Sequence, residues 1–132
     1  MRRFYLDANL APDLSEALSS VFTRDRFRSA KRENLLNEQD LPLFLELQSR
    51  QFDAIITLDL KQVENVKERA GLRGARLHWV GLEQEDAGQA VVASLASKAF
   101  IGVARLSELW PEQPHMFRVG RSALDPVRFE RL

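Results

Sequence analysis

Two short apolar stretches that each end on an aspartate constrain the fold of this chain more than any other feature. Phe4, Tyr5 and Leu6 are three consecutive large apolar residues, and Asp7 follows them directly. Residues 54–58 are also apolar or β-branched, and Asp59 follows them. Continuous runs of this kind and length are typical of strands buried on both faces. The pattern predicts two strands of a parallel sheet, each with a carboxylate at its carboxyl end.

The rest of the chain alternates between helical and extended patterns. The spacing of apolar residues predicts helices over residues 10–22, 40–50, 61–71 and 86–101, and a short helix between Gly102 and Pro111. Further strands are predicted over residues 26–30, 75–81 and 116–119, and a polar connection over 31–39. Alternation of strand and helix predicts an α/β fold: a three-layer α/β/α sandwich with a central parallel sheet. We expect one domain over residues 1–132.

Local signals predict where these helices begin and end. Asn9 and Asp40 are expected N-caps, since Asn and Asp are favoured there, and Gly71 is an expected C-terminal signal. The buried face of the second helix is expected to carry Leu41, Phe44, Leu45 and Gln48, and that of the helix from residue 61 to carry Val63, Val66 and Ala70.

The composition excludes several kinds of chemistry. The chain has no cysteine, which excludes disulfides, thiolate metal sites and a cysteine nucleophile. Its two histidines, His78 and His115, make a histidine-rich zinc site an unfavoured interpretation. The formal net charge is 0, so contact with nucleic acid would require a local basic patch.

The sequence also bears on location. It contains no apolar run near the ~20 residues that a membrane span requires. Asp7 lies too close to the first residue for an N-terminal signal peptide with an apolar centre. We therefore expect a cytoplasmic protein of bacterial type, with no membrane partner.

Three carboxylates are expected at one edge of the sheet. Asp7 and Asp59 end strands, and Asp40 begins a helix. In repeated strand–helix units, helices begin at the edge where strands end, so the three can converge. Like charges held together are costly unless a cation lies between them, and Mg²⁺ and Mn²⁺ prefer oxygen ligands. Each aspartate also has a structural interpretation, as a helix cap or a turn residue.

Other residues have a functional and a structural interpretation each. Thr57 is a supporting residue for Asp59 or an ordinary strand residue. Arg26 and Arg28 contact an RNA backbone or mark an edge strand, and Lys61 contacts a phosphate or is a solvated helix residue. Asn9 is a helix cap or a supporting residue beside Asp7. The tail over residues 111–132 closes the fold, binds a partner or guides substrate.

The order of these motifs resembles the PIN-like domain family. The stretch from Phe4 to Pro12, F-Y-L-D-A-N-L-A-P, is similar to that family's opening strand and D-x-N-L-x-P motif, and residues 55–59 are similar to its strand and T-x-D motif. Asp40 heads the intervening helix, and the resemblance is clearest over residues 3–82. It implies a three-layer sandwich and an Mg²⁺- or Mn²⁺-dependent ribonuclease, in many members the toxin of a toxin–antitoxin pair.

By position, the resemblance makes Asp7, Asp40 and Asp59 the catalytic, metal-binding residues, with Asn9 beside the first. The implied partners are an RNA substrate and an antitoxin protein, with a homodimer as a further expectation. The family commonly carries a fourth acidic or polar residue soon after the T-x-D motif, where this chain has Lys61, with Glu64 one turn on. We therefore expect one metal rather than two.

Two interpretations of a different kind stay open. The first is a catalytically inactive PIN-like scaffold that binds a partner. The second is a signalling receiver domain in which Asp59 accepts a phosphoryl group. A receiver normally has two acids after its first strand and a lysine after a later one, whereas here Asp7 stands alone.

Overall fold

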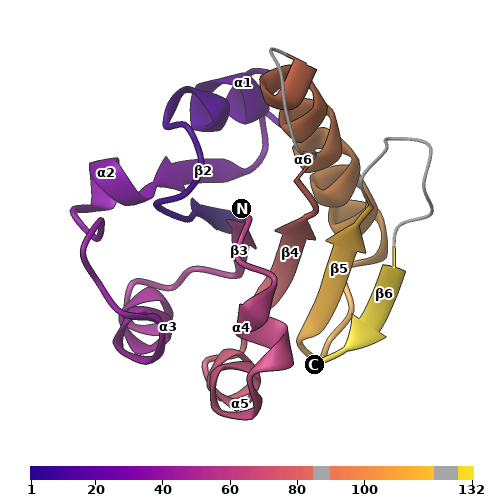
Figure 1. The fold of residues 1–132 in the computed structure, drawn as a ribbon. Coiled ribbons are helices and arrows are strands. Elements are labelled where there is room, and N and C mark those ends of the chain that lie inside the picture. Colours follow the sequence, from indigo (N-terminus) through magenta and orange to yellow (C-terminus); the bar gives the residue numbers. More distant parts are fainter. Residues whose placement is uncertain (85–89, 121–127) are drawn as a thin grey trace.

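A six-stranded sheet runs through the protein, of which the computed structural model describes residues 1–84, 90–120 and 128–132. The strands lie in the order β2-β1-β3-β4-β5-β6 (Figure 1). Their bounds are β1 Arg3–Leu6, β2 Arg26–Ser29, β3 Ala54–Thr57, β4 His78–Leu82, β5 His115–Val119 and β6 Arg128–Arg131. Strands β1 to β5 are parallel, and β6 pairs antiparallel with β5. The α/β class and the parallel pairing agree with the prediction.

Helices pack against both faces of this sheet (Figure 1). Their bounds are α1 Asp13–Val21, α2 Ala30–Glu33, α3 Asp40–Ser49, α4 Lys61–Glu64, α5 Val66–Gly74 and α6 Ala90–Leu109. On one face, α1 and α6 contribute Leu18 and Val103 to a core with Phe4. On the other, α3 and α5 contribute buried leucines to a core with Tyr5 and Ile55. No helix in the described ranges has the length and apolar character needed to cross a membrane.

Strands β1 and β3 lie side by side at the point where the direction of winding reverses. From β1 the chain passes through α1 to β2 on one side, and it then returns past β1 to β3 on the other. Residues 4–6 and 54–57 are fully buried, as the continuous apolar pattern predicts. In open α/β sheets, ligands bind beyond the carboxyl ends of the strands at such a switch point.

The buried face of α3 differs from the prediction. Helix α3 starts at Asp40, but Gln39 occupies the N-cap position, without a side-chain cap, so the predicted cap role of Asp40 is wrong. The buried residues are Leu43, Phe44 and Leu47, whereas Leu41, Leu45 and Gln48 are exposed. Because leucines occur at four positions of this helix, its periodicity defines two apolar faces, and only the sheet selects between them.

The segment predicted as one helix over residues 61–71 is two helices. The break is at Asn65, whose side-chain oxygen accepts hydrogen bonds from the N–H groups of Lys67 and Glu68 and so caps α5. Val66 is exposed rather than on the buried face. Gly71 lies within α5 against Phe44 instead of ending the helix, so the predicted C-terminal signal is wrong.

Helix α6 continues through Gly102, where the sequence predicts a break. A Cβ on Gly102 would lie 2.6 Å from Val80 Cγ1 and 3.2 Å from Val119 Cγ2. The glycine therefore allows α6 to approach the sheet closely and does not interrupt it. The predicted start of this helix at Asp86 lies outside the described residues.

Two elements were not predicted. Ser29 caps the one-turn helix α2, inside the predicted polar connection, by accepting a hydrogen bond from the N–H of Arg32. Strand β6 follows β5, and its exposed residues include one large apolar side chain, Phe129, which explains why its pattern is weak. Because β6 pairs along β5, this part of the tail extends the sheet at its edge.

Replacing Gly102 by Ala should lower the free energy of unfolding by about 1–2 kcal/mol. The added methyl group overlaps Val80, a stiff β-branched side chain, and this overpacking exceeds the gain in helix propensity. Gly74→Ala is the matched control, because a Cβ on Gly74 would meet no atom within 4 Å. Urea unfolding measures both. A Gly102→Ala protein as stable as the control would contradict this packing argument.

Candidate functional site

Asp7 is a largely buried carboxylate at the carboxyl end of β1. It follows Leu6, which pairs with Ile56 of β3, so Asp7 lies beside the end of β3. Its Oδ2 accepts a hydrogen bond of 2.8 Å from the Thr57 hydroxyl, and its Oδ1 accepts one of 2.8 Å from the N–H of Ala8. These bonds hold the carboxylate in one orientation.

Thr57 joins the segments that follow β1 and β3 through a single hydroxyl group. It is fully buried, donates to Asp7, and accepts from the N–H of Asp59 at 3.0 Å and from the amide nitrogen of Asn9 at 3.3 Å. The Asn9 oxygen accepts from the N–H of Leu58 at 3.2 Å. Asn9 is therefore not the cap of α1, which begins at Asp13 without a side-chain cap, and instead ties the two strand ends together.

Gln62 connects Asp7 to Asp40, and the sequence did not single it out. Its amide nitrogen donates to Asp7 Oδ2 at 3.2 Å and to Asp40 Oδ1 at 3.1 Å, and its amide oxygen accepts from the indole N–H of Trp79 at 3.2 Å. The side chain is fully buried. Nothing in the sequence of the one-turn helix α4 indicates which of its residues points inward.

Glu68 is a second residue that sequence reasoning missed. Its carboxyl lies within hydrogen-bonding reach of Asp40, and this contact, partial burial and the charges of Asp40 and Asp59 raise its pKa to about 7. Asp40 and Glu68 line a hollow of about 500 Å³, together with Asn65 and Lys67. Glu68 falls beside Asp40 because Asn65 ends α4 and starts α5, a break that the helical pattern does not indicate.

Asp59 is held differently from the other two aspartates. Its Oδ1 accepts a hydrogen bond of 3.1 Å from the N–H of Lys61. This bond forms a turn, which is the structural interpretation of Asp59 given by the sequence. Lys61 is exposed at the start of α4. Across residues 1–84, 90–120 and 128–132, no three acidic, histidine or cysteine side chains are grouped so that they could hold a metal together. Asp7 and Asp40 converge through Gln62, and Asp59 lies near enough to influence Glu68.

The buried position of Asp7 destabilises the ionised form of its carboxylate. Burial raises the pKa of Asp7, hydrogen bonds from Thr57 and Ala8 lower it, the Asp40 charge raises it, and the Gln62 bond lowers it. The net direction is upward, because removal from water outweighs the donors. A cation near this edge would stabilise the ionised form.

Asp7 and Asp40 offer carboxylate oxygens, the type of ligand that Mg²⁺ and Mn²⁺ prefer. Within the described residues, no third acidic or histidine side chain is grouped with them as a further ligand. Asp7 Oδ2 and Asp40 Oδ1 share the NH₂ group of Gln62 as a donor. An ion held beside these two carboxylates would keep several water ligands, as Mg²⁺ usually does.

The two predicted RNA-contact arginines lie on edge strand β2. Arg26 opens the strand, at the edge of the sheet opposite to Asp7, and is exposed. Arg28 lies 3.4 Å from the carboxylate of Glu33, which also contacts Arg50 at 3.3 Å and Arg3 at 3.8 Å. Arg28 therefore belongs to an ion-pair network that joins β1, β2, α2 and the C-terminal end of α3.

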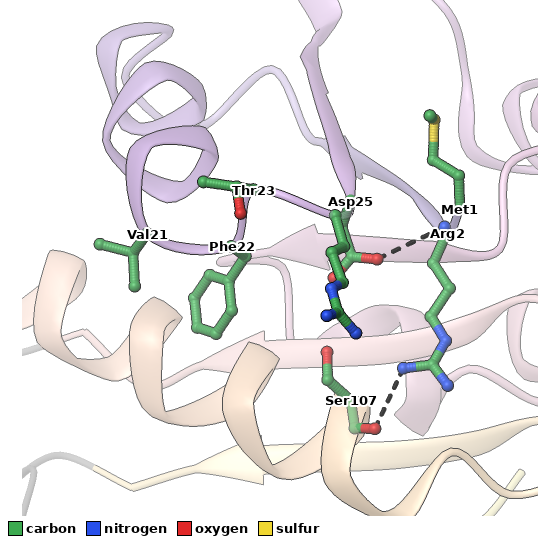
Figure 2. Close-up of a pocket in the computed structure, with 8 residues that line it drawn as sticks. Met1, Arg2, Val21, Phe22, Thr23, Asp25 and Ser107 are labelled. Atoms are coloured by element: carbon green, nitrogen blue, oxygen red, sulfur yellow. Dashed lines mark hydrogen bonds between the residues drawn. The ribbon is translucent and has the colours of Figure 1, made fainter.

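A larger hollow, of about 560 Å³, lies at the amino edge of the sheet, opposite to the carboxylates (Figure 2). Arg2 lines it: its backbone N–H donates to Asp25 at 3.4 Å, and its guanidinium donates to the Ser107 carbonyl at 3.0 Å (Figure 2). The same guanidinium lies 4.2 Å from the centre of the Trp110 ring. These contacts join the N-terminal segment to α6. We assign this hollow a structural role.

The protein is thus an α/β protein with an acidic site at its β1/β3 switch point. Comparisons with protein-family models, with curated proteins and with solved structures found no significant match.

Replacing Glu68 by Gln should raise the melting temperature at pH 8, by about 1–3 °C, and leave it nearly unchanged at pH 5. The pKa of Glu68 is about 7 in the folded protein and ordinarily 4.5, so the folded chain retains a proton that the unfolded chain has released between these values. Stability therefore falls as pH rises through this window, and Gln removes the decline.

This prediction is measured by thermal melts with a chelator present. Glu112→Gln, at an exposed position, is the control for loss of one surface charge. An equal effect of Glu68→Gln at both pH values would show that Glu68 does not sense Asp40.

Proposed function

We propose that this protein is a metal-dependent endoribonuclease of PIN-like type that acts as the toxin of a toxin–antitoxin pair. The observation that carries the proposal is the convergence of Asp7 and Asp40 on the buried amide of Gln62 at the β1/β3 switch point. Two buried or half-buried carboxylates at such an edge are costly for stability. A bound cation would offset this cost, which supports a role for the two carboxylates in binding a metal ion.

The hydrogen bonds among the motif residues give further support. Asn9 and Asp7 belong to the D-x-N motif, and Thr57 and Asp59 belong to the T-x-D motif. The Thr57 hydroxyl bonds to the other three: the side chains of Asp7 and Asn9 and the N–H of Asp59. The two motifs on which the resemblance rests therefore form one hydrogen-bonded unit, although 48 residues separate Asn9 from Thr57.

Roles follow from these positions. Asp7 and Asp40 would hold Mg²⁺ or Mn²⁺, with Asp59 and Glu68 beside them. When bound, such an ion supplies an activated water and stabilises charge on the phosphate. Thr57 and Gln62 orient Asp7, and Glu68, with its pKa of about 7, can exchange a proton near neutral pH. Lys61 is exposed two residues past Asp59, where it can contact an RNA phosphate.

One observation favours the inactive scaffold. The Asp7 carboxylate and one oxygen of Asp40 already accept hydrogen bonds from protein donors, so the fold does not require a cation. The same buried hydrogen bonds are compatible with a surface that only binds a partner protein. Metal binding is therefore the property that separates the two interpretations.

The strand order favours the receiver interpretation to a limited degree. Strands β2-β1-β3-β4-β5 have the doubly wound order of flavodoxin-like proteins, which include phosphoacceptor receivers. However, Asp59 lies two residues beyond the end of β3, and it is held by a turn to Lys61. Incubation with acetyl phosphate should therefore not add the mass of a phosphoryl group at Asp59. The unmodified protein and an Asp59→Asn variant should behave alike in mass spectrometry.

Replacing Asp7 by Asn should abolish Mn²⁺ binding and reduce RNA cleavage by more than the ~10–100-fold typical of losing a supporting residue. The melting temperature should change by no more than about 4 °C, because the loss of a buried charge offsets the weakened hydrogen bonds. Calorimetric titration with Mn²⁺ and cleavage of a labelled RNA measure the two effects.

Asp13→Asn is the matched control, because Asp13 is an exposed aspartate of α1 near the same edge. Full activity of the Asp7→Asn protein would contradict the nuclease proposal. Absence of Mn²⁺ binding by the unmodified protein would favour the scaffold.

A further inference from the structure

Gln62 lies between the two carboxylates of the proposed site and is completely buried. We infer that Gln62 is a positioning residue that sets the orientation and separation of the Asp7 and Asp40 carboxylates, and that Trp79 determines which way its amide faces. The inference deepens the proposed function and rests on it. Gln62 acts through the two carboxylates and not on the substrate.

The direction of the Gln62 amide follows from the chemistry of its neighbours. An indole N–H only donates hydrogen bonds, and an ionised carboxylate only accepts them. The amide oxygen must therefore face Trp79, 3.2 Å away, and the NH₂ group must face Asp7 and Asp40. The reversed amide would oppose donor to donor at Trp79 and acceptor to acceptor at both aspartates, so a single orientation is stable.

Trp79 is itself held in place by the sheet. It lies in β4, fully buried, and its indole covers Gly81, where a Cβ would overlap the ring. β4 pairs with β3, so the indole N–H has a defined position relative to the end of β3. The rigid centre of the sheet thus determines the position of the amide, and the amide determines the positions of the carboxylates.

This arrangement prepares the site before any ion arrives. One neutral NH₂ group donates to two like-charged groups, so it compensates both charges and keeps their oxygens apart. Because Asp7 and Asp40 come from different segments of the chain, after β1 and at the start of α3, Gln62 is the residue that links their geometry. Groups that orient metal ligands typically contribute 10–100-fold to metal affinity.

Replacing Gln62 by Met should weaken Mn²⁺ binding by about 10–100-fold in calorimetric titration. Met has a similar length but no amide, so both carboxylates lose their shared donor. Gln48→Met is the matched control, because Gln48 is an exposed glutamine of α3, and it should bind Mn²⁺ as the unmodified protein does. Circular dichroism and thermal melts establish that each variant is folded.

Trp79→Phe tests the connection to the sheet. This change removes the indole N–H, so the amide loses the contact that orients it. It should weaken Mn²⁺ binding in the unmodified background and have no further effect in the Gln62→Met background. Additive losses in the double variant would overturn the role assigned to Trp79.

A measurement on the unmodified protein keeps the inference testable if the variants do not fold. Trace Mn²⁺ should broaden the NMR signals of the Gln62 side-chain NH₂ and the Trp79 indole N–H. The indole signal of Trp110, near the opposite edge of the sheet, should stay sharp.

The outcomes separate the two proposals. Unchanged Mn²⁺ affinity in a folded Gln62→Met protein, or a Gln62 amide signal that stays sharp while Mn²⁺ binds, would overturn the positioning role and leave the nuclease proposal standing. Absence of Mn²⁺ binding by the unmodified protein would overturn both.

Discussion

The buried charge of Asp7 is the constraint on which the organisation of the site depends. An ionised carboxylate removed from water must be hydrogen-bonded, or its burial costs several kcal/mol. The partners here are the hydroxyl of Thr57, the N–H of Ala8 and the amide of Gln62. They come from three different segments, so satisfying one charge determines how the ends of β1 and β3 and the start of α4 lie relative to each other.

The sheet provides this carboxylate with a rigid support. β1 has neighbours on both sides and helices on both faces, so Phe4, Tyr5 and Leu6 are fully buried. Two glycines allow the close packing that this requires: Gly102 lets α6 approach Val80, and Gly81 leaves room for the Trp79 indole. The residues that shape the site therefore include several that never touch it.

The predictions were most reliable where one physical signal acted alone. The apolar runs that end at Asp7 and Asp59 predicted two buried parallel strands, because only a strand covered on both faces needs such a run. They were wrong where two signals competed. In α3 the leucines define two possible faces, and at Gly102 the conformational freedom of glycine suggested a break where its small size was the relevant property.

The candidate site was predicted in part. The sequence indicated Asp7, Asn9 and Thr57, and the structure brings them together, although Asn9 serves as a bridge rather than as a helix cap. Gln62 and Glu68 were missed. Both lie in the segment that Asn65 divides into α4 and α5. Along one continuous helix, the two side chains would point in directions different from those observed.

The α/β class, the central strands and the carboxylates at their ends follow from the order of the residues, because they depend on local periodicity. Which polar groups meet those carboxylates depends on the folded arrangement. The contact of Trp79 with Gln62, and of Gln62 with Asp7 and Asp40, joins residues up to 55 positions apart. Hydrogen bonds of this kind depend on the packing of whole helices against the sheet, and no local pattern of residues encodes them.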